Sequence, residues 1–80
     1  MRPIIWTEPA KADIRRLDRS IAMNIFYALH RFAKLGEGDV KALEARDEYR
    51  LRVGDFRILF ITTTNRIEVR RVRHRSEAYR

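Results

Sequence analysis

The chain has 80 residues, with 18 Lys and Arg against 11 Asp and Glu, a formal net charge of +7 and no cysteine. So short a chain allows one domain with a small core, which we expect to span residues 1–80, and the lack of cysteine excludes a disulfide framework and a thiolate metal site. No apolar run approaches the roughly 20 residues that cross a bilayer, and residues 1–6 lack the long apolar region of a signal peptide, so we expect a cytoplasmic protein.

The first part of the chain predicts a short strand followed by a helix. Residues 4–6 are an apolar run, and Thr7 can cap a helix whose first turn holds an acid and a proline. Apolar residues then recur at helical spacing as far as Leu17, and Asp18 offers a break and a new cap. The charged residues of this first helix are expected to form a solvated face; they are Lys11, Asp13, Arg15 and Arg16.

A second helix repeats the pattern over a greater length. Its apolar stripe consists of Ile21, Ile25, Ala28, Leu29 and Phe32. Gly36 and Gly38 end the helix where a left-handed backbone is needed, so we expect a linker around residues 36–39. Because the connection between the two helices is so short, we predict that they run antiparallel.

Beyond the linker the side-chain period changes from about 3.6 to 2, which predicts a sheet. Residues 49–53 alternate between apolar residues and arginine, and a two-residue turn at 54–55 leads into a second strand over residues 56–62. That strand is apolar on both faces, as expected for a central strand. A third strand follows over residues 67–72. The predicted fold class is α+β, with an N-terminal strand and a helical hairpin packed on a small antiparallel β-sheet.

The positive charge gathers toward the C-terminus. Most acidic residues lie upstream, and the last fifteen positions hold Arg66, Arg70, Arg71, Arg73, Arg75 and Arg80. A basic face built by the C-terminal half favours a polyanion such as nucleic acid, or an acidic protein, as the partner.

Two motifs carry a resemblance to a known family. They are YRLRVGDFR at residues 49–57 and VRHRSEAY at residues 72–79. Together with Trp6 at the end of the first strand and the order of the predicted elements, they resemble the RelE-type toxins of the RelE/ParE superfamily over essentially the whole chain. The resemblance implies a RelE-like microbial ribonuclease-type fold and the toxin of a bacterial type II toxin–antitoxin system.

The resemblance also implies an activity. RelE-type toxins enter the ribosomal A site and cleave messenger RNA by attack of a 2′-hydroxyl on the adjacent phosphate, using basic side chains rather than a metal or cofactor. A chain of this kind is expected to be a ribosome-dependent endoribonuclease that inhibits translation. Such cleavage needs in-line positioning, stabilisation of charge on the phosphate and proton transfers at the attacking and leaving oxygens.

The resemblance implies catalytic roles for three residues. Arg57 resembles the phosphate-gripping arginine of the central strand, Arg73 the second arginine on the last strand, and Tyr79 the C-terminal catalytic tyrosine. Arginine suits a phosphate because its planar guanidinium stays charged and donates two hydrogen bonds. The simpler interpretations are a structural ion pair for Arg57, a solvated surface for Arg73 and a ring packed on the sheet for Tyr79.

The remaining candidates concern RNA binding and proton transfer. Arg50 and Arg52 share one face of their strand and, with Arg75, are expected to contact the RNA backbone, unless they are ordinary exposed residues. Arg50 and Arg52 stand where RelE has lysines, and an arginine is a poor base. The proton transfers are therefore expected to fall to Tyr79, to a substrate nucleotide, or to His74, since histidine exchanges protons near neutral pH.

Two other functions remain open. A ParE-like toxin inhibits DNA gyrase through protein contacts without chemistry of its own, and it shares the fold, so the fold alone does not discriminate. A degenerate, non-toxic member that still binds its antitoxin is the other alternative. The presence of Arg57, Arg73 and Tyr79 together favours the nuclease, because phosphate chemistry needs them and gyrase binding does not.

The expected partners are the ribosome with its messenger and an acidic antitoxin. A basic domain with an apolar sheet gains both charge neutralisation and apolar burial from an acidic, partly disordered chain that wraps around it. We expect this antitoxin to cover the C-terminal basic face in a toxin–antitoxin hetero-oligomer, and no membrane contact.

Overall fold

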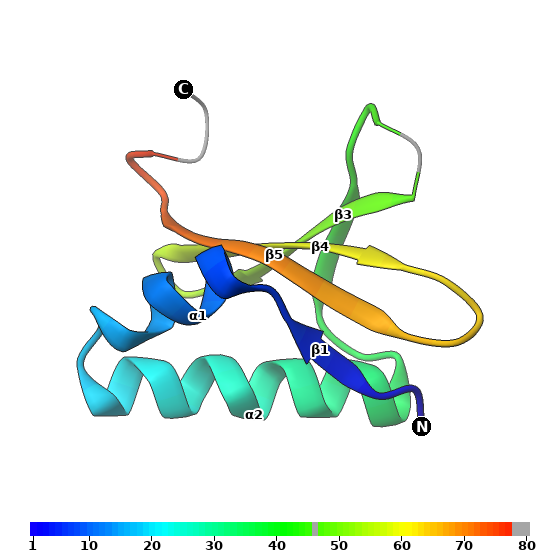
Figure 1. The fold of residues 1–80 in the computed structure, drawn as a ribbon, viewed down its shortest axis with the longest axis horizontal. Coiled ribbons are helices and arrows are strands. Elements are labelled where there is room, and N and C mark those ends of the chain that lie inside the picture. The colour runs from blue at the N-terminus through cyan, green and yellow to red at the C-terminus, as the bar shows by residue number, and fades with distance from the viewer. Residues whose placement is uncertain (46, 78–80) are drawn as a thin grey trace.

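The computed structural model describes residues 1–45 and 47–77. In that part of the chain the elements are β1 (Ile4–Trp6), α1 (Glu8–Arg15), α2 (Arg19–Leu35), β2 (Asp39–Ala42), β3 (Glu48–Val53), β4 (Phe56–Thr62) and β5 (Ile67–His74). The strands form one five-stranded sheet in the order β1-β5-β4-β3-β2. Both helices lie on the same side of this sheet (Figure 1). The predicted α+β fold class is confirmed, and β4 is the central strand as expected.

The helix boundaries follow the predicted caps. The Thr7 hydroxyl oxygen accepts a hydrogen bond from the backbone N–H of Ala10 at 3.3 Å. Gly36 ends α2 with a left-handed φ of 70°. Asp18 takes the N-cap position of α2, but its side chain makes no capping hydrogen bond. Figure 1 shows α2 running back beneath α1, as the short connection predicted. Of the two helices in residues 1–45 and 47–77, neither is long and apolar enough to span a membrane.

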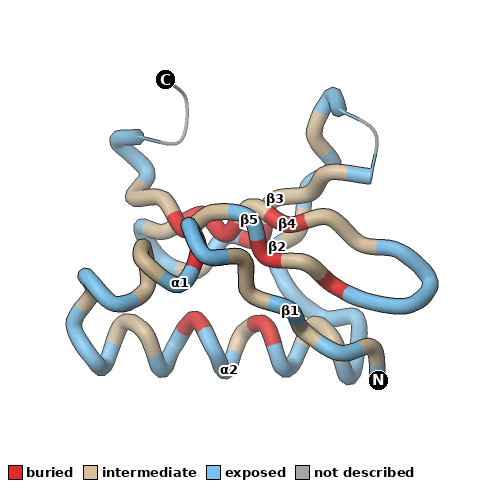
Figure 2. The backbone as a smooth tube through the Cα atoms, in the orientation of Figure 1, coloured by how far each residue is buried: buried red, intermediate tan, exposed pale blue. Residues whose placement is uncertain are grey.

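The core lies between α2 and the sheet, where Figure 2 places the buried segments. Its buried residues are Ala10, Ile25, Leu29, Leu51, Ile58, Phe60, Ile67, Val69 and Val72. Phe60 is the largest of them, and its ring centroid lies 5.3 Å from that of Phe32 and 5.7 Å from that of Tyr49. The apolar stripe predicted for the second helix therefore does form its buried face.

Two features of the sheet differ from the sequence-based expectation. β2 was not predicted; Asp39, assigned to a linker, is its first residue and pairs with Arg52. β2 is short and largely exposed, so little in its own residues signals a strand, and its pairing with β3 defines it. β1 pairs with β5 in parallel, so one edge of the sheet is mixed rather than antiparallel.

Candidate functional site

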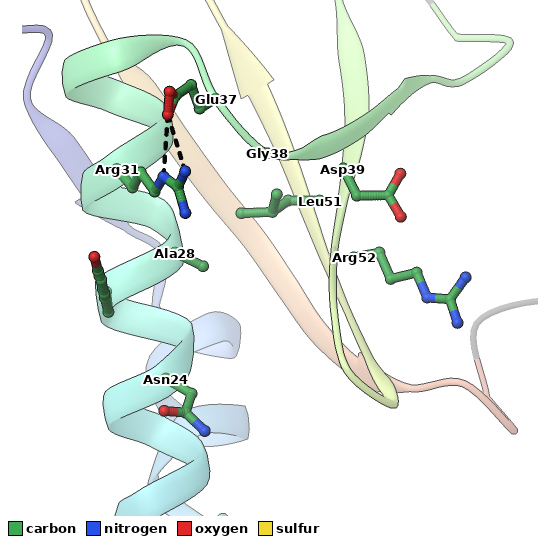
Figure 3. A pocket seen from close by; sticks show the side chains of 9 residues that line it. Asn24, Ala28, Arg31, Glu37, Gly38, Asp39, Leu51 and Arg52 are labelled. Carbon is green, nitrogen blue, oxygen red and sulfur yellow. Dashed lines mark hydrogen bonds and ion pairs between the residues drawn. The ribbon is translucent and has the colours of Figure 1, made fainter.

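The arginines gather on the face of the sheet that is turned away from the helices. Leu51, Ile58 and Val72 lie opposite one another on β3, β4 and β5 and are buried on the helix side. Because successive side chains in a strand point to opposite faces, their sequence neighbours point the other way. We call this surface the open face; it includes Arg50, Arg52, Arg57, Leu59, Arg71 and Arg73. In Figure 3, Arg52 points away from α2 and Leu51 points toward it.

Three of these arginines form one row across the open face. Arg52 on β3 lies directly opposite Arg57 on β4, which lies directly opposite Arg73 on β5. We call these three residues the arginine row. The Cβ atoms of directly opposite residues are about 5 Å apart, and like charges in this arrangement destabilise a sheet. The row therefore costs folding free energy, which an anionic ligand would recover.

A β-bulge sets the alignment of the row. Leu59 lies opposite Arg71 and Phe60 lies opposite Val69, so Arg70 is an extra residue on β5. An extra residue reverses which side chains face outward beyond it. Arg73 reaches the open face, and Val72 the core, because of this bulge. The sequence carries its signal, since the alternation of β5 breaks at the adjacent Arg70 and Arg71.

Arg57 is held rigidly in the middle of the row. Only 6% of its surface is exposed, and one terminal nitrogen (Nη1) donates hydrogen bonds of 3.1 Å to the carbonyl oxygens of Gly54 and Phe56. Among the described residues, its buried Nε has no hydrogen-bond partner. A buried polar group without a partner is unfavourable, so this nitrogen adds to the cost of placing Arg57 in the row.

His74 and Arg73 line one cavity at the edge of β5, beside α1. Its volume is about 160 Å³, and its lining also includes Asp13, Arg71 and Glu77. The His74 ring packs edge-on against Phe56, with the ring centroids 5.3 Å apart. These two residues lie opposite each other and alternate with Arg57 and Arg73, so they face the helix side of the sheet and not the arginine row. Its Nδ1 accepts a hydrogen bond from the backbone N–H of Ser76 at 3.2 Å. The neutral ring therefore carries its proton on Nε2.

Asp13 corrects the expectation of a fully solvated helix face. Only 9% of its side chain is exposed, and it accepts two hydrogen bonds from Arg71, at 2.8 and 3.1 Å, and one from the backbone N–H of Val72 at 2.9 Å. Burial alone would raise the pKa of Asp13, but these hydrogen bonds and the charges of Arg71 and Arg73 lower it. Helical spacing could have identified it, because Asp13 lies between Ala10 and Leu17 on the inward stripe.

The other predicted residues lie around the row. Arg50 lies on the open face opposite Leu59. Arg75 follows β5 with an exposed side chain, and its backbone N–H donates to the Asp55 carbonyl oxygen at 2.7 Å. Tyr79 lies outside the described residues. Within the described ranges no three histidine, aspartate or glutamate side chains gather as metal ligands.

A further cavity lies between α2 and the sheet, on the helix side. It has a volume of about 210 Å³, and Arg31 and Glu37 meet on its lining through hydrogen bonds of 3.0 and 3.3 Å (Figure 3). Arg52 contributes to its lining, while the Arg52 and Asp39 side chains both point away from α2. The cavity therefore borders the open face at Arg52.

Comparisons with known proteins agree with this architecture. A chain of the RelB–RelE antitoxin–toxin complex from Methanococcus jannaschii is 22% identical, with a TM-score of 0.78 over 94% of each chain. A chain of the archaeal RelE–RelB complex from Pyrococcus horikoshii OT3 is 17% identical, with a TM-score of 0.81 over 96% of this chain and 98% of that one. A chain of the DinJ–YafQ complex from E. coli is 11% identical, with a TM-score of 0.78 over all of both chains.

Sequence comparison identifies the family. No curated protein sequence matches the chain significantly. Residues 4–79 match the family model described as the ParE toxin of type II toxin-antitoxin system, parDE. The match spans nearly the whole chain, and the fold of the RelE and YafQ complexes accompanies it. The chain therefore belongs to the ParE toxin family of type II toxin–antitoxin systems, within the RelE/ParE superfamily.

Proposed function

We propose that this toxin is a ribosome-dependent endoribonuclease that cleaves messenger RNA at the arginine row. The observation that carries the proposal is the alignment of Arg52, Arg57 and Arg73 across three strands, with Arg57 buried and its Nε without an acceptor among the described residues. Such an arrangement destabilises the free protein and suits a bound phosphate. RelE and YafQ chains share the fold, which supports the assignment at the level of architecture.

In the proposed reaction the 2′-oxygen of one nucleotide attacks the adjacent phosphorus, and the bond from phosphorus to the 5′-oxygen of the next nucleotide breaks. The products are a 2′,3′-cyclic phosphate and a free 5′-hydroxyl. Negative charge develops on the non-bridging oxygens, and Arg57, whose guanidinium is held in place, and Arg73 stabilise it by hydrogen bonds. Arg50, Arg52 and Arg75 hold the RNA backbone on either side.

Proton transfer requires groups other than these arginines. His74 is the first proposed group. It faces the helix side of the sheet, but it lines the same edge cavity as Arg73, and its Nδ1 is occupied by the Ser76 N–H, so its Nε2 would exchange the proton with the substrate at this edge. Tyr79 is the second proposed group and lies outside the described residues. Changing His74 to Gln should lower the rate of cleavage on ribosomes, and a folded variant with an unchanged rate would remove the imidazole from the reaction.

The proposal is tested by adding the chain to translating ribosomes and, in parallel, to the same messenger without ribosomes. Cleavage should appear only with ribosomes and should map to the codon in the A site. The Arg66→Ala variant is the control and should cleave normally. Arg66 is exposed and lies outside the row, and its substitution removes one positive charge, as the substitution of a row arginine does. Equal cutting of free RNA, or no cutting at all, would reject a ribosome-dependent nuclease.

Inhibition of DNA gyrase is the second candidate function. The observation that favours it is the family match itself, since the matched model is described as the ParE toxin. The same preparation should therefore be tested for inhibition of supercoiling by gyrase. Inhibition that persists in an Arg57→Ala variant, together with no RNA cleavage, would assign the chain to this function instead.

We further propose that an acidic antitoxin binds this toxin over its C-terminal basic face. The chain carries a net charge of +7, and the related RelE and YafQ structures are complexes with antitoxins named RelB and DinJ. Removing Arg73 and Arg75 together should weaken antitoxin binding, with a loss that shrinks at high salt. An affinity unchanged by the double substitution, measured by calorimetry, would place the antitoxin elsewhere.

A further inference from the structure

We propose that a cavity on the open face binds one nucleobase of the substrate RNA and that Glu48 selects bases that offer amino hydrogens. This inference rests on the proposed function, since it takes RNA as the substrate. It adds a specificity-determining site to the arginine row. None of the residues proposed for catalysis forms this cavity.

The cavity lies at the first residue of β3, Glu48, beside Leu43, which follows β2. Its volume is about 190 Å³, and it is lined by Leu43, Glu48, Tyr49, Leu59, Phe60, Arg70 and Arg71. Strand register places Glu48, Leu59 and Arg71 on the open face. Leu43 joins them, because its backbone N–H donates to the Glu48 carbonyl oxygen at 2.9 Å.

The floor of the cavity suits a flat aromatic ligand. Leu59 lies opposite Arg71 on β5, and both line the cavity, so an apolar side chain lies beside an arginine whose guanidinium is held in place by Asp13. Proteins recognise unstacked RNA bases by apolar contact, by stacking on aromatic rings or guanidinium planes, and by hydrogen bonds to the base edge. A volume below the roughly 300–1,000 Å³ of sites for drug-sized ligands fits a single base rather than a longer segment.

Glu48 provides the hydrogen bonds that discriminate between bases. Its side chain is half-buried, and an ionised carboxylate only accepts hydrogen bonds. In the described part of the chain this carboxylate has no hydrogen bond or ion pair with another side chain. Guanine presents an N1–H and an amino group side by side, which matches two carboxylate oxygens. Uracil presents carbonyl oxygens on either side of one N–H, which a carboxylate repels.

Glu68 is a carboxylate on the same face that, unlike Glu48, is paired with arginine. Glu48 on β3 and Glu68 on β5 both lie directly opposite Ile61 on β4, on the open face. Glu68 is held by Arg66 at 3.6 Å and Arg70 at 2.6 Å. Of these two carboxylates, only Glu48 lines the cavity and only Glu68 is paired with arginine.

The cavity is also placed correctly relative to the arginine row. Leu59 follows Arg57 by two residues on β4, a separation of about 7 Å along the strand on the same face. One nucleotide can therefore put its base over Leu59 while its phosphate meets Arg57. Glu48 then forms its hydrogen bonds with the base next to the cleaved bond.

The test is an NMR titration of the 80-residue chain with guanosine 5′-monophosphate and with uridine 5′-monophosphate. The Leu43 and Leu59 methyl resonances should shift with the guanosine nucleotide, and the uridine nucleotide should require at least about tenfold more ligand, the discrimination expected of a good two-hydrogen-bond contact to a base. Glu48→Gln should remove most of this difference, whereas the matched Glu68→Gln variant should retain it.

Methyl groups that do not shift, or that shift equally with both nucleotides in the unsubstituted chain, would overturn the base site. This readout does not depend on cleavage. If the chain discriminates between the nucleotides but never cleaves RNA, the proposed nuclease function is rejected and the base site stands. If the chain cleaves RNA on ribosomes but does not discriminate between the nucleotides, the nuclease function stands and the base site is rejected.

Discussion

Replacing Arg57 by alanine should lower the rate of ribosome-dependent cleavage by about 100- to 1,000-fold, the usual cost of removing one fixed donor to a charge that develops in a transition state. The size of the effect follows from preorganisation. Hydrogen bonds to Gly54 and Phe56 hold the guanidinium before substrate arrives, and its burial weakens the screening by water. Single-turnover cleavage on programmed ribosomes measures this rate directly.

The controls separate chemistry from folding. Arg57→Lys keeps the charge but loses the planar fork, so we expect it to recover only a small part of the rate. Arg66→Ala removes one positive charge outside the row and should leave the rate nearly unchanged. Thermal unfolding of each variant shows whether it is folded at the assay temperature. A folded Arg57→Ala variant with the full cleavage rate would remove Arg57 from the reaction.

Replacing Asp13 by alanine should lower the free energy of unfolding by about 1.5–3 kcal/mol, the range for a hydrogen bond to a charged group. The substitution removes the acceptor of Arg71 and of the Val72 N–H, on the part of β5 that β1 does not cover. In a domain of this size such a loss lowers the melting temperature by about 10 °C. Urea unfolding followed by circular dichroism measures it.

A matched substitution and the pH dependence of unfolding test whether the Asp13 carboxylate causes this loss of stability. Glu8→Ala removes an exposed carboxylate from the same helix, whose ion pair with Lys11 at 3.4 Å should contribute less than about 1 kcal/mol. Because the pKa of Asp13 is lowered from its ordinary 3.8, the folded state favours the ionised carboxyl. Its contribution should be complete above pH 3.8 and be lost as the pH falls through the lower folded value. A difference between wild type and Asp13→Asn that is constant with pH would contradict this account.

Local patterns predicted much of the fold because the relevant contacts are close in the sequence. The alternation in residues 49–53 gave the strand and placed Arg50 and Arg52 on one face, and the two residues after Val53 gave the hairpin turn. The apolar stripe of the second helix gave its buried side. Each of these follows from the period of one element and needs no knowledge of its partners.

The remaining features depend on distant pairings. The parallel pairing of β1 with β5 and the strand at Asp39–Ala42 are defined by partners elsewhere in the chain. The arginine row exists only in the register that the bulge at Arg70 creates, so resemblance named Arg57 and Arg73 without their alignment. Asp13 was misassigned because its partners, Arg71 and Val72, lie 58 and 59 residues away.

The chemical nature of the RNA ends made on translating ribosomes tests the central claim most directly. If the arginine row promotes attack of the 2′-hydroxyl, the upstream fragment should end in a 2′,3′-cyclic phosphate and the downstream fragment should begin with a 5′-hydroxyl. End-specific ligation followed by sequencing distinguishes these ends from all others. Fragments with a 3′-hydroxyl and a 5′-phosphate, or a messenger that stays intact while the folded toxin is present, would contradict the account.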